Sequence, residues 1–205
     1  HATHSHEDAQ DMRNMGGLAR FMPLTAGLMI IATLAIAGVP PLSGFFSKDE
    51  ILSMAFGRGE HQPVFRVFWA MGAAAALLTA FYMARLVAMT FFGANRTGAE
   101  EQRHLHEAPW IMTGPLVVLG GLSIMGGVLN APAFTQDFVT PHRLESWLHP
   151  LTATGARIAE GLGTSPVPPE GGTETTLLLL AIVLAIGGLM LGWTISRKAR
   201  MVPAH

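Results

Sequence analysis

The chain has 205 residues, of which 50% are hydrophobic and 13% are charged, and 13 Lys and Arg against 14 Asp and Glu give a net charge of -1. A typical soluble domain carries about 25% charged residues, so this composition excludes an ordinary soluble enzyme and indicates that lipid surrounds most of the chain. The near-zero net charge excludes a basic surface for nucleic acid. Without any cysteine, these residues form no disulfide, thiolate metal site or iron–sulfur cluster.

The opening residues are polar and begin with histidine. They contain no apolar core of a secretory signal, so we expect the sequence to be a piece of a longer polypeptide. Four apolar stretches follow, each long enough to cross about 30 Å of hydrocarbon as a helix of about 20 residues. They cover residues 24–46, 64–92, 110–129 and 177–195.

Only helices and closed barrels satisfy every backbone hydrogen bond in lipid, and apolar stretches of this length are typical of helices. The predicted fold class is therefore an all-α integral membrane protein, a multi-pass transmembrane helix bundle. Its orientation follows from Lys and Arg, which are retained on the cytoplasmic side. With the N-terminus inside, seven of them lie inside and four outside: Arg13, Arg20, Arg96, Arg103, Arg197, Lys198 and Arg200 against Arg58, Arg66, Arg143 and Arg157.

The first apolar stretch is interrupted by paired prolines, in the string VPPLSG at residues 39–44. The prolines remove two amide donors and Gly44 adds flexibility, which predicts a kink or break in the helix. Helices broken inside a membrane line cavities and ion paths in transporters. We therefore expect one Pro-Pro broken helix in the bundle.

Three ionisable residues follow the break directly, in Ser47-Lys48-Asp49-Glu50. One interpretation is a capping box, with Ser47 and Glu50 starting a short helix at the membrane surface. The other is that Ser47 starts a second half-helix within the bundle, which places Lys48 at depth beside Asp49. A charged lysine near mid-bilayer costs about 2.5 to 3.5 kcal/mol, so it would pair, snorkel or exchange its proton.

A polar stripe marks the second apolar stretch, where Thr79, Tyr82 and Arg85 recur at helical spacing. Arg85 lies about two turns inside the end of the stretch, so its side chain could snorkel to the cytoplasmic interface or pair structurally. Alternatively the stripe belongs to a proton-conducting polar axis, for which Lys48 and its carboxylates are the facing partners.

Two further patterns concern packing. Leu144, Trp147, Leu148 and Leu151 recur at helical spacing beside charged residues, which predicts an interfacial amphipathic helix or a helix that caps neighbouring subunits. Gly188 and Gly192 form a G-x-x-x-G that predicts close helix packing within a bundle. The chain then divides into a cytoplasmic N-terminal segment (1–22), the broken helix and following span (23–93), a cytoplasmic loop and third span (94–130), an extracytoplasmic loop with the amphipathic helix (131–174), and a fourth span with a basic cytoplasmic end (175–205).

Close histidine pairs occur twice, as His1-x-x-His4-x-His6 and His104-x-His106. Both lie in polar segments with no second ligand set at a recognisable spacing, so we expect no metal site. No phosphate-binding, dinucleotide-binding or hydrolase motif occurs in the sequence.

Four strings together resemble one family. They are QDMRNMGGL at residues 10–18, AIAGVPPLSGFFSKDEIL at residues 35–52, TAFYMAR at residues 79–85 and TFFG at residues 90–93. They are similar to the distal antiporter-like subunit of respiratory complex I, the NuoL type. Beyond Gly93 the resemblance is general, in the order of the spans and the amphipathic stretch.

The resemblance implies a C-terminal fragment that holds part of the second of two inverted antiporter-like repeats. It implies a proton-translocating membrane-arm subunit of NADH:quinone oxidoreductase, an enzyme of the translocase class, in which Lys48 is the terminal lysine of a proton channel and Asp49 its charged neighbour. It implies no redox chemistry or cofactor within this stretch, since NADH, FMN, iron–sulfur clusters and quinone belong to partner subunits.

The same resemblance implies other membrane-arm subunits as partners, above all the neighbouring antiporter-like subunit, and membrane lipid. The expected location is the bacterial inner membrane, with an organellar energy-transducing membrane as the alternative. Two other functions remain open: the large subunit of an Mrp-type Na+/H+ antiporter, which has a similar Pro-Pro and Ser-Lys segment, and a purely structural membrane anchor.

Overall fold

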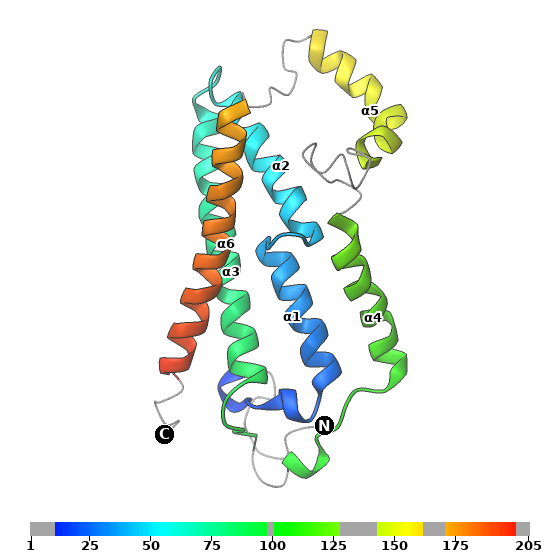
Figure 1. Ribbon diagram of the computed structural model, residues 1–205, viewed down its shortest axis with the longest axis vertical. Coiled ribbons are helices and arrows are strands. Elements are labelled where there is room, and N and C mark those ends of the chain that lie inside the picture. Colours follow the sequence, from blue (N-terminus) through cyan, green and yellow to red (C-terminus); the bar gives the residue numbers. More distant parts are fainter. Residues whose placement is uncertain (1–10, 98–100, 128–142, 162–170, 200–205) are drawn as a thin grey trace.

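The structure is a computed structural model, and it describes residues 11–97, 101–127, 143–161 and 171–199. Within these ranges all regular structure is helical (Figure 1). The helices are η1 (Met12–Asn14), η2 (Leu18–Arg20), α1 (Pro23–Ala37), α2 (Ser43–Arg58), α3 (Val64–Phe91), η3 (Glu101–His104), α4 (Trp110–Met125), α5 (Arg143–Gly161) and α6 (Gly171–Ala199). The chain therefore has the predicted all-helical fold.

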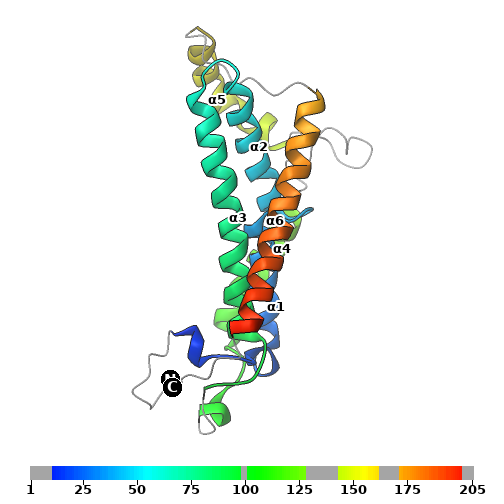
Figure 2. The same cartoon turned by 90° about the vertical axis from the view of Figure 1, so that its left-hand side faces the viewer.

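The helices of the bundle run roughly along one long axis (Figures 1 and 2). α3 and α6 pack against each other along much of their length, α1 packs on α3 and α4, and α2 lies against α3 beyond the end of α1. η1, η2 and the carboxyl ends of α3 and α6 gather at one end of the bundle, whereas the α2–α3 turn and α5 lie at the other. The basic residues that the sequence separated into two groups therefore lie at opposite ends, except Arg200, which is outside the described residues.

The first predicted apolar stretch, residues 24–46, is two helices. α1 begins with Pro23, whose fixed φ suits the first helical position. It ends at Gly38, which adopts a left-handed conformation (φ 83°) and donates its N–H to the Ala35 and Leu34 carbonyls. Residues 39–42 are not helical, they include a cis Pro40–Pro41 bond, and α2 begins at Ser43.

The predicted start of a helix at Ser47 is wrong. α2 begins four residues earlier, and the Ser47 hydroxyl donates to the Gly44 carbonyl at 3.4 Å inside the second turn. Ser47 and Glu50 therefore form no capping box. The physical reason is that Leu42, directly after the prolines, has the extended conformation of a residue that precedes a helix (φ -74°, ψ 156°), so the helix starts as soon as the chain leaves the prolines. Gly44 allows this, because a Cβ there would collide with the Ala35 carbonyl.

The close packing predicted for Gly188 and Gly192 is confirmed, and α3 is the partner. A Cβ on Gly188 would lie 2.6 Å from the Leu77 carbonyl oxygen, and one on Gly192 would collide with the Phe81 carbonyl. Without side chains at these two positions, the backbones of α3 and α6 approach closely, as small residues permit in membrane bundles.

Two helices are long and apolar enough to cross a membrane, α3 and residues 172–197 of α6, with mean hydropathies of 1.7 and 2.4. Only 6% and 17% of their most apolar windows are buried within the chain. α1 and α4 are apolar but shorter, with 15 and 16 residues. Apolar helices that expose their side chains fit a membrane helix bundle and not the core of a soluble protein.

α5 is the predicted amphipathic helix, and it extends well beyond residues 144–151 on its carboxyl side. Trp147 and Leu151 lie one turn apart on it, with 76% and 80% of their surfaces exposed. The described part of the chain does not cover this apolar face, which agrees with both sequence interpretations, a membrane surface or a neighbouring subunit.

Candidate functional site

Lys48 lies where α1 and α2 meet. It occupies the second turn of α2, its side chain is half-buried, and its Nζ donates a hydrogen bond to the carbonyl oxygen of Ile36 at 2.6 Å. In a continuous helix that carbonyl would accept from the N–H of residue 40. Residue 40 is proline and has no N–H. The proline therefore frees the acceptor that Lys48 binds.

The stem of the Lys48 side chain lies beside Gly38. A Cβ built on Gly38 would be 3.5 Å from the Lys48 Cδ, in ordinary van der Waals contact. The left-handed φ of 83° is the stronger constraint, since side-chain-bearing residues rarely adopt it. Gly38 thus ends α1 with its own N–H on earlier carbonyls and leaves the Ile36 carbonyl to Lys48.

A cavity of about 170 Å³ lies between α2 and α3 next to Lys48. Its lining residues are Lys48, Ile51, Leu52, Gly72, Ala75, Ala76 and Thr79. The volume is ample for water, and Lys48 and Thr79 supply the polar groups that a water molecule needs. The Thr79 hydroxyl itself donates to the Ala75 carbonyl at 2.7 Å, which leaves its oxygen able to accept.

Of the three residues in the predicted polar stripe, the structure brings Thr79 to Lys48. Tyr82 is 51% exposed, Arg85 is half-buried, and neither lines the cavity. Helix geometry explains the difference, because at 3.6 residues per turn Arg85 lies about 120° around the helix from Thr79.

Asp49 is half-buried on α2, next to Lys48 along the helix. α2 also approaches α6, whose first turn carries Glu174. The acidic side chain nearest to Asp49 from another helix therefore has the same charge.

Histidines form no metal centre in the part of the chain that the structure describes, where no group of three His, Asp or Glu side chains comes together. The Nδ1 of His106 forms a hydrogen bond with the backbone carbonyl oxygen of Glu107 at 2.8 Å. The His1, His4 and His6 cluster lies outside the described residues.

Two charged residues that the sequence did not single out hold α1 and the N-terminal segment. Glu107 accepts from the backbone N–H groups of Leu24 (2.8 Å) and Thr25 (3.4 Å) and from the Thr25 hydroxyl. The Thr25 hydroxyl, together with these amides, holds the pKa of the Glu107 carboxyl below its usual value. A signal was present in the sequence: Met22 precedes the helix at Pro23 and offers no capping side chain, so another segment must cap it.

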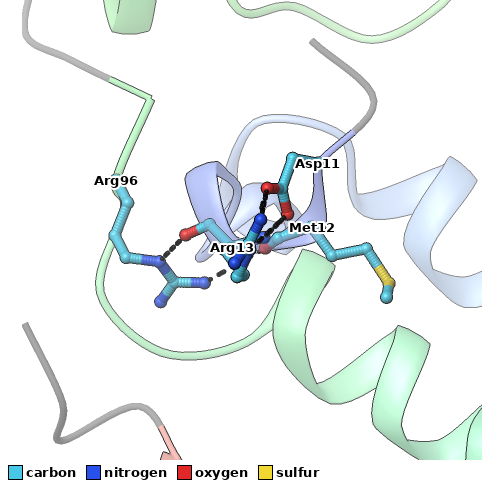
Figure 3. A network of polar contacts seen from close by, with 4 residues as sticks. All are labelled: Asp11, Met12, Arg13 and Arg96. Carbon is cyan, nitrogen blue, oxygen red and sulfur yellow. Dashed lines mark hydrogen bonds and ion pairs between the residues drawn. The ribbon is translucent and has the colours of Figure 1, made fainter. Parts of the chain in front are cut away.

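The second is Arg96, in the loop after α3 (Figure 3). Its guanidinium donates to the carbonyls of Arg13 (2.6 Å), Met89 (3.2 Å) and Met12 (3.4 Å). Arg13 pairs in turn with Asp11 at 2.7 Å, and this hydrogen-bonded arginine lowers the pKa of the Asp11 carboxyl. Arg96 thereby ties the carboxyl end of α3 to the segment that leads into α1.

The described residues form an apolar helical bundle in which Lys48 lies beside a proline-containing break between α1 and α2. The comparisons show which class of membrane protein this is. Residues 1–79 match the family model described as "NADH:quinone oxidoreductase/Mrp antiporter, TM". The chain belongs more narrowly to the NuoL-type subunits of complex I.

Three relatives show the extent of the similarity. NADH-quinone oxidoreductase subunit L of Mycobacterium tuberculosis H37Rv is 39% identical over 200 residues, covering 87% of this chain and 30% of the relative. NAD(P)H-quinone oxidoreductase chain 5 of a Picosynechococcus species is 37% identical over 195 residues, covering 86% and 27%. NADH-ubiquinone oxidoreductase chain 5 of Cryptococcus neoformans is 39% identical over 140 residues, covering 67% and 21%. The chain thus spans 30% or less of the length of these relatives.

Proposed function

We propose that this chain is part of a proton-translocating membrane subunit of NADH:quinone oxidoreductase and that Lys48 is the terminal lysine of its proton channel. The observation that carries the proposal is the bond from Lys48 to the Ile36 carbonyl, beside a cavity that reaches Thr79. The names of the relatives support the assignment to NADH:quinone oxidoreductase. The lysine at an interrupted helix supports the role in proton transfer.

We infer that α1 and α2 are the two halves of one broken transmembrane helix in the second antiporter-like repeat. With 15 and 16 residues they are about 22 and 24 Å long, and each is shorter than the roughly 30 Å of hydrocarbon. Joined through residues 38–42 they cross it. The break, and Lys48 with it, then lies inside the membrane, where broken helices are tolerated if they line a cavity.

The ammonium of Lys48 is stabilised at this place by the carbonyl end of α1, which carries a partial negative charge. After losing its proton the amine keeps N–H groups but no charge, so its attraction to that helix end falls. Water in the adjacent cavity, hydrogen-bonded to the Thr79 hydroxyl, would carry the proton to and from Lys48, and Asp49 is the charged neighbour of this lysine along α2. A proton moved against the membrane potential costs about 2.3 kcal/mol per 100 mV, so a distant energy source must drive the exchange.

That source is oxidation of NADH in partner subunits, to which we assign FMN, the iron–sulfur clusters and quinone. Neighbouring membrane-arm subunits, above all another antiporter-like subunit, are the proposed partners, together with lipid. The bacterial inner membrane is the proposed location, in keeping with the bacterial relatives. We propose that Tyr82 and Arg85 belong to a separate polar path or lie at the cytoplasmic membrane interface.

A second candidate function is favoured by the family model itself, whose description joins the quinone oxidoreductases to Mrp antiporters. In an Mrp-type Na+/H+ antiporter the same lysine would exchange protons without any redox partner. A structural anchor is the third candidate, and it requires that Lys48 be dispensable.

The test is Lys48→Ala in the intact complex that contains this chain, with proton pumping and quinone reduction measured together in sealed vesicles. We expect about a threefold or greater fall in protons moved per quinone reduced, with assembly unchanged. The control is Ser47→Ala, which changes an exposed neighbour on α2. Unchanged pumping by assembled Lys48→Ala would make this segment a scaffold, and pumping of protons against Na+ without NADH would favour the antiporter.

A further inference from the structure

Charged side chains from other segments hold α1 at both ends. At its first turn Glu107 accepts from the Leu24 and Thr25 amides and the Thr25 hydroxyl, and at its last turn Lys48 donates to the Ile36 carbonyl. A negative charge at the amino end and a positive charge at the carboxyl end both complement the helix dipole. The two residues thus bind opposite ends of one helix, although Glu107 lies in the loop before α4 and Lys48 in α2.

Neither end of α1 has a local substitute for these partners. Met22 makes no side-chain capping bond to the helix, and Pro40 has no N–H for the Ile36 carbonyl. Beyond the last turn comes left-handed Gly38 and a non-helical link to α2. The link is not helical, so it does not itself set the position of α1 relative to α2, and that position depends on the packing of α1 on α3 and α4 and on the partners at its ends.

α1 transmits a displacement along its axis because its internal hydrogen bonds make it a stiff rod of about 22 Å. If its first turn moves, the Ile36 carbonyl moves with it. A shift of about 1 Å would stretch the bond from the Lys48 Nζ, at 2.6 Å, beyond hydrogen-bonding distance wherever the lysine side chain does not follow it. The loop that carries Glu107 lies at the same end of the bundle as the start of α1 (Figure 1).

We propose that Glu107 is a positioning residue for Lys48: by anchoring the first turn of α1, it fixes the place of the carbonyl that receives the Lys48 ammonium. This inference rests on the proposed function of Lys48. Glu107 itself moves no proton along the channel, and it acts through the position of α1. Thr25 contributes the side-chain part of the anchor.

The experiment uses the intact complex in sealed vesicles and measures protons moved per quinone reduced. Glu107→Gln keeps the size of the side chain and removes its charge, and we expect the ratio to fall about twofold or more with assembly unchanged. Glu107→Asp retains the carboxylate, and we expect it to recover at least about half of the lost ratio. The matched control is Glu60→Gln on the exposed α2–α3 turn, which should keep the wild-type ratio.

An assembled Glu107→Gln complex with an unchanged ratio would overturn the inference. This holds even if its melting temperature falls, because Glu107 would then act only as a structural cap. If Glu107→Gln does not assemble, Thr25→Val removes one bond and should lower the ratio to a smaller extent, whereas an unchanged ratio overturns the inference. Lys48→Ala on the same vesicles separates the two proposals. If it lowers the ratio and Glu107→Gln does not, only the role of Glu107 fails, and if neither lowers it, the proposed function fails.

Discussion

The missing amide N–H of Pro40 determines which carbonyl at the junction of α1 and α2 is available to Lys48. Pro40 cannot donate to Ile36, and Gly38 turns the chain away, so one carbonyl of the last helical turn remains for the Lys48 ammonium. Unpaired carbonyls at helix ends need partners, and a cation suits them best. The prolines and the lysine therefore form one structural unit, whereas the sequence predicts the break and a lysine at depth but not the carbonyl that this lysine binds.

We expect Gly38→Ala to damage this unit. Alanine in a left-handed conformation costs about 1 to 2 kcal/mol, so the end of α1 should shift to relieve it. The added Cβ itself would lie in ordinary contact with the Lys48 Cδ, at 3.5 Å, so the cost comes from the backbone conformation. The predicted result is a lower melting temperature of the complex and fewer protons moved per quinone reduced, both measured on purified complex and vesicles.

The control for that experiment is Gly27→Ala, in the second turn of the same helix. A Cβ at Gly27 meets nothing within 4 Å, and alanine is favoured over glycine inside a helix by about 0.5 to 1 kcal/mol. Gly27→Ala should leave both measurements unchanged or raise the melting temperature. Equal effects of the two variants would contradict the role assigned to Gly38.

At the scale of the elements, apolar length predicts most of the bundle. The second stretch, 64–92, matches α3 (Val64–Phe91) to within a residue, and α4 begins at the expected Trp110. These helices are specified by continuous apolar sequence, which needs no tertiary information. The boundary of α2 could not be predicted in this way, because Ser47 and Glu50 imitate a local cap while the prolines upstream set the actual start.

The parts of the site that the sequence could not predict depend on tertiary contacts. The position of Lys48 beside the prolines makes it a candidate from the sequence, but its acceptor, the Ile36 carbonyl, can be identified only in the folded α1 and α2. Glu107 lies 83 residues from Leu24, so no local pattern relates the two. Thr79, Tyr82 and Arg85 share a spacing of three, which is too short to keep them on one face over two turns.

The pairing of α3 with α6 gives a prediction about glycine. Gly192→Val places a branched side chain against the Phe81 carbonyl, where even a Cβ has no room, so the helices must separate. Overpacking of this kind costs about 1 to 3 kcal/mol. We expect a lower melting temperature and reduced assembly, measured by the yield of intact complex after mild detergent extraction.

The neighbouring Gly187 supplies the comparison. A Cβ there meets nothing within 4 Å, so Gly187→Val adds the same side chain to open space. It should assemble like the unaltered protein. If both variants assemble equally well, the close approach at Gly192 does not stabilise the pair.

For the molecule as a whole, the two ends of the bundle differ in charge and in chain segments. Among the described residues, η1, η2, the loops before α4 and the end of α6 lie at one end with six basic residues, and the α2–α3 turn and α5 lie at the other with four. The six are Arg13, Arg20, Arg96, Arg103, Arg197 and Lys198, and the four are Arg58, Arg66, Arg143 and Arg157. Positive charge is retained on the cytoplasmic side, so the first end should face the cytoplasm. α3 runs from one end to the other, so residues just beyond its two ends must be accessible from opposite sides of the membrane.

The absence of cysteine from the chain allows this orientation to be measured directly. His61→Cys, on the exposed α2–α3 turn, and His104→Cys, in exposed η3, place one thiol at each end of the bundle. In whole cells whose subunit carries no other cysteine, a membrane-impermeant maleimide should label His61→Cys, and His104→Cys should react only after the membrane is opened. The reverse pattern would mean that the predicted topology is inverted, with the bundle intact. Labelling of both thiols in whole cells would mean that α3 does not cross the membrane. Lys48 would then lack the low-dielectric surroundings that its proposed role requires.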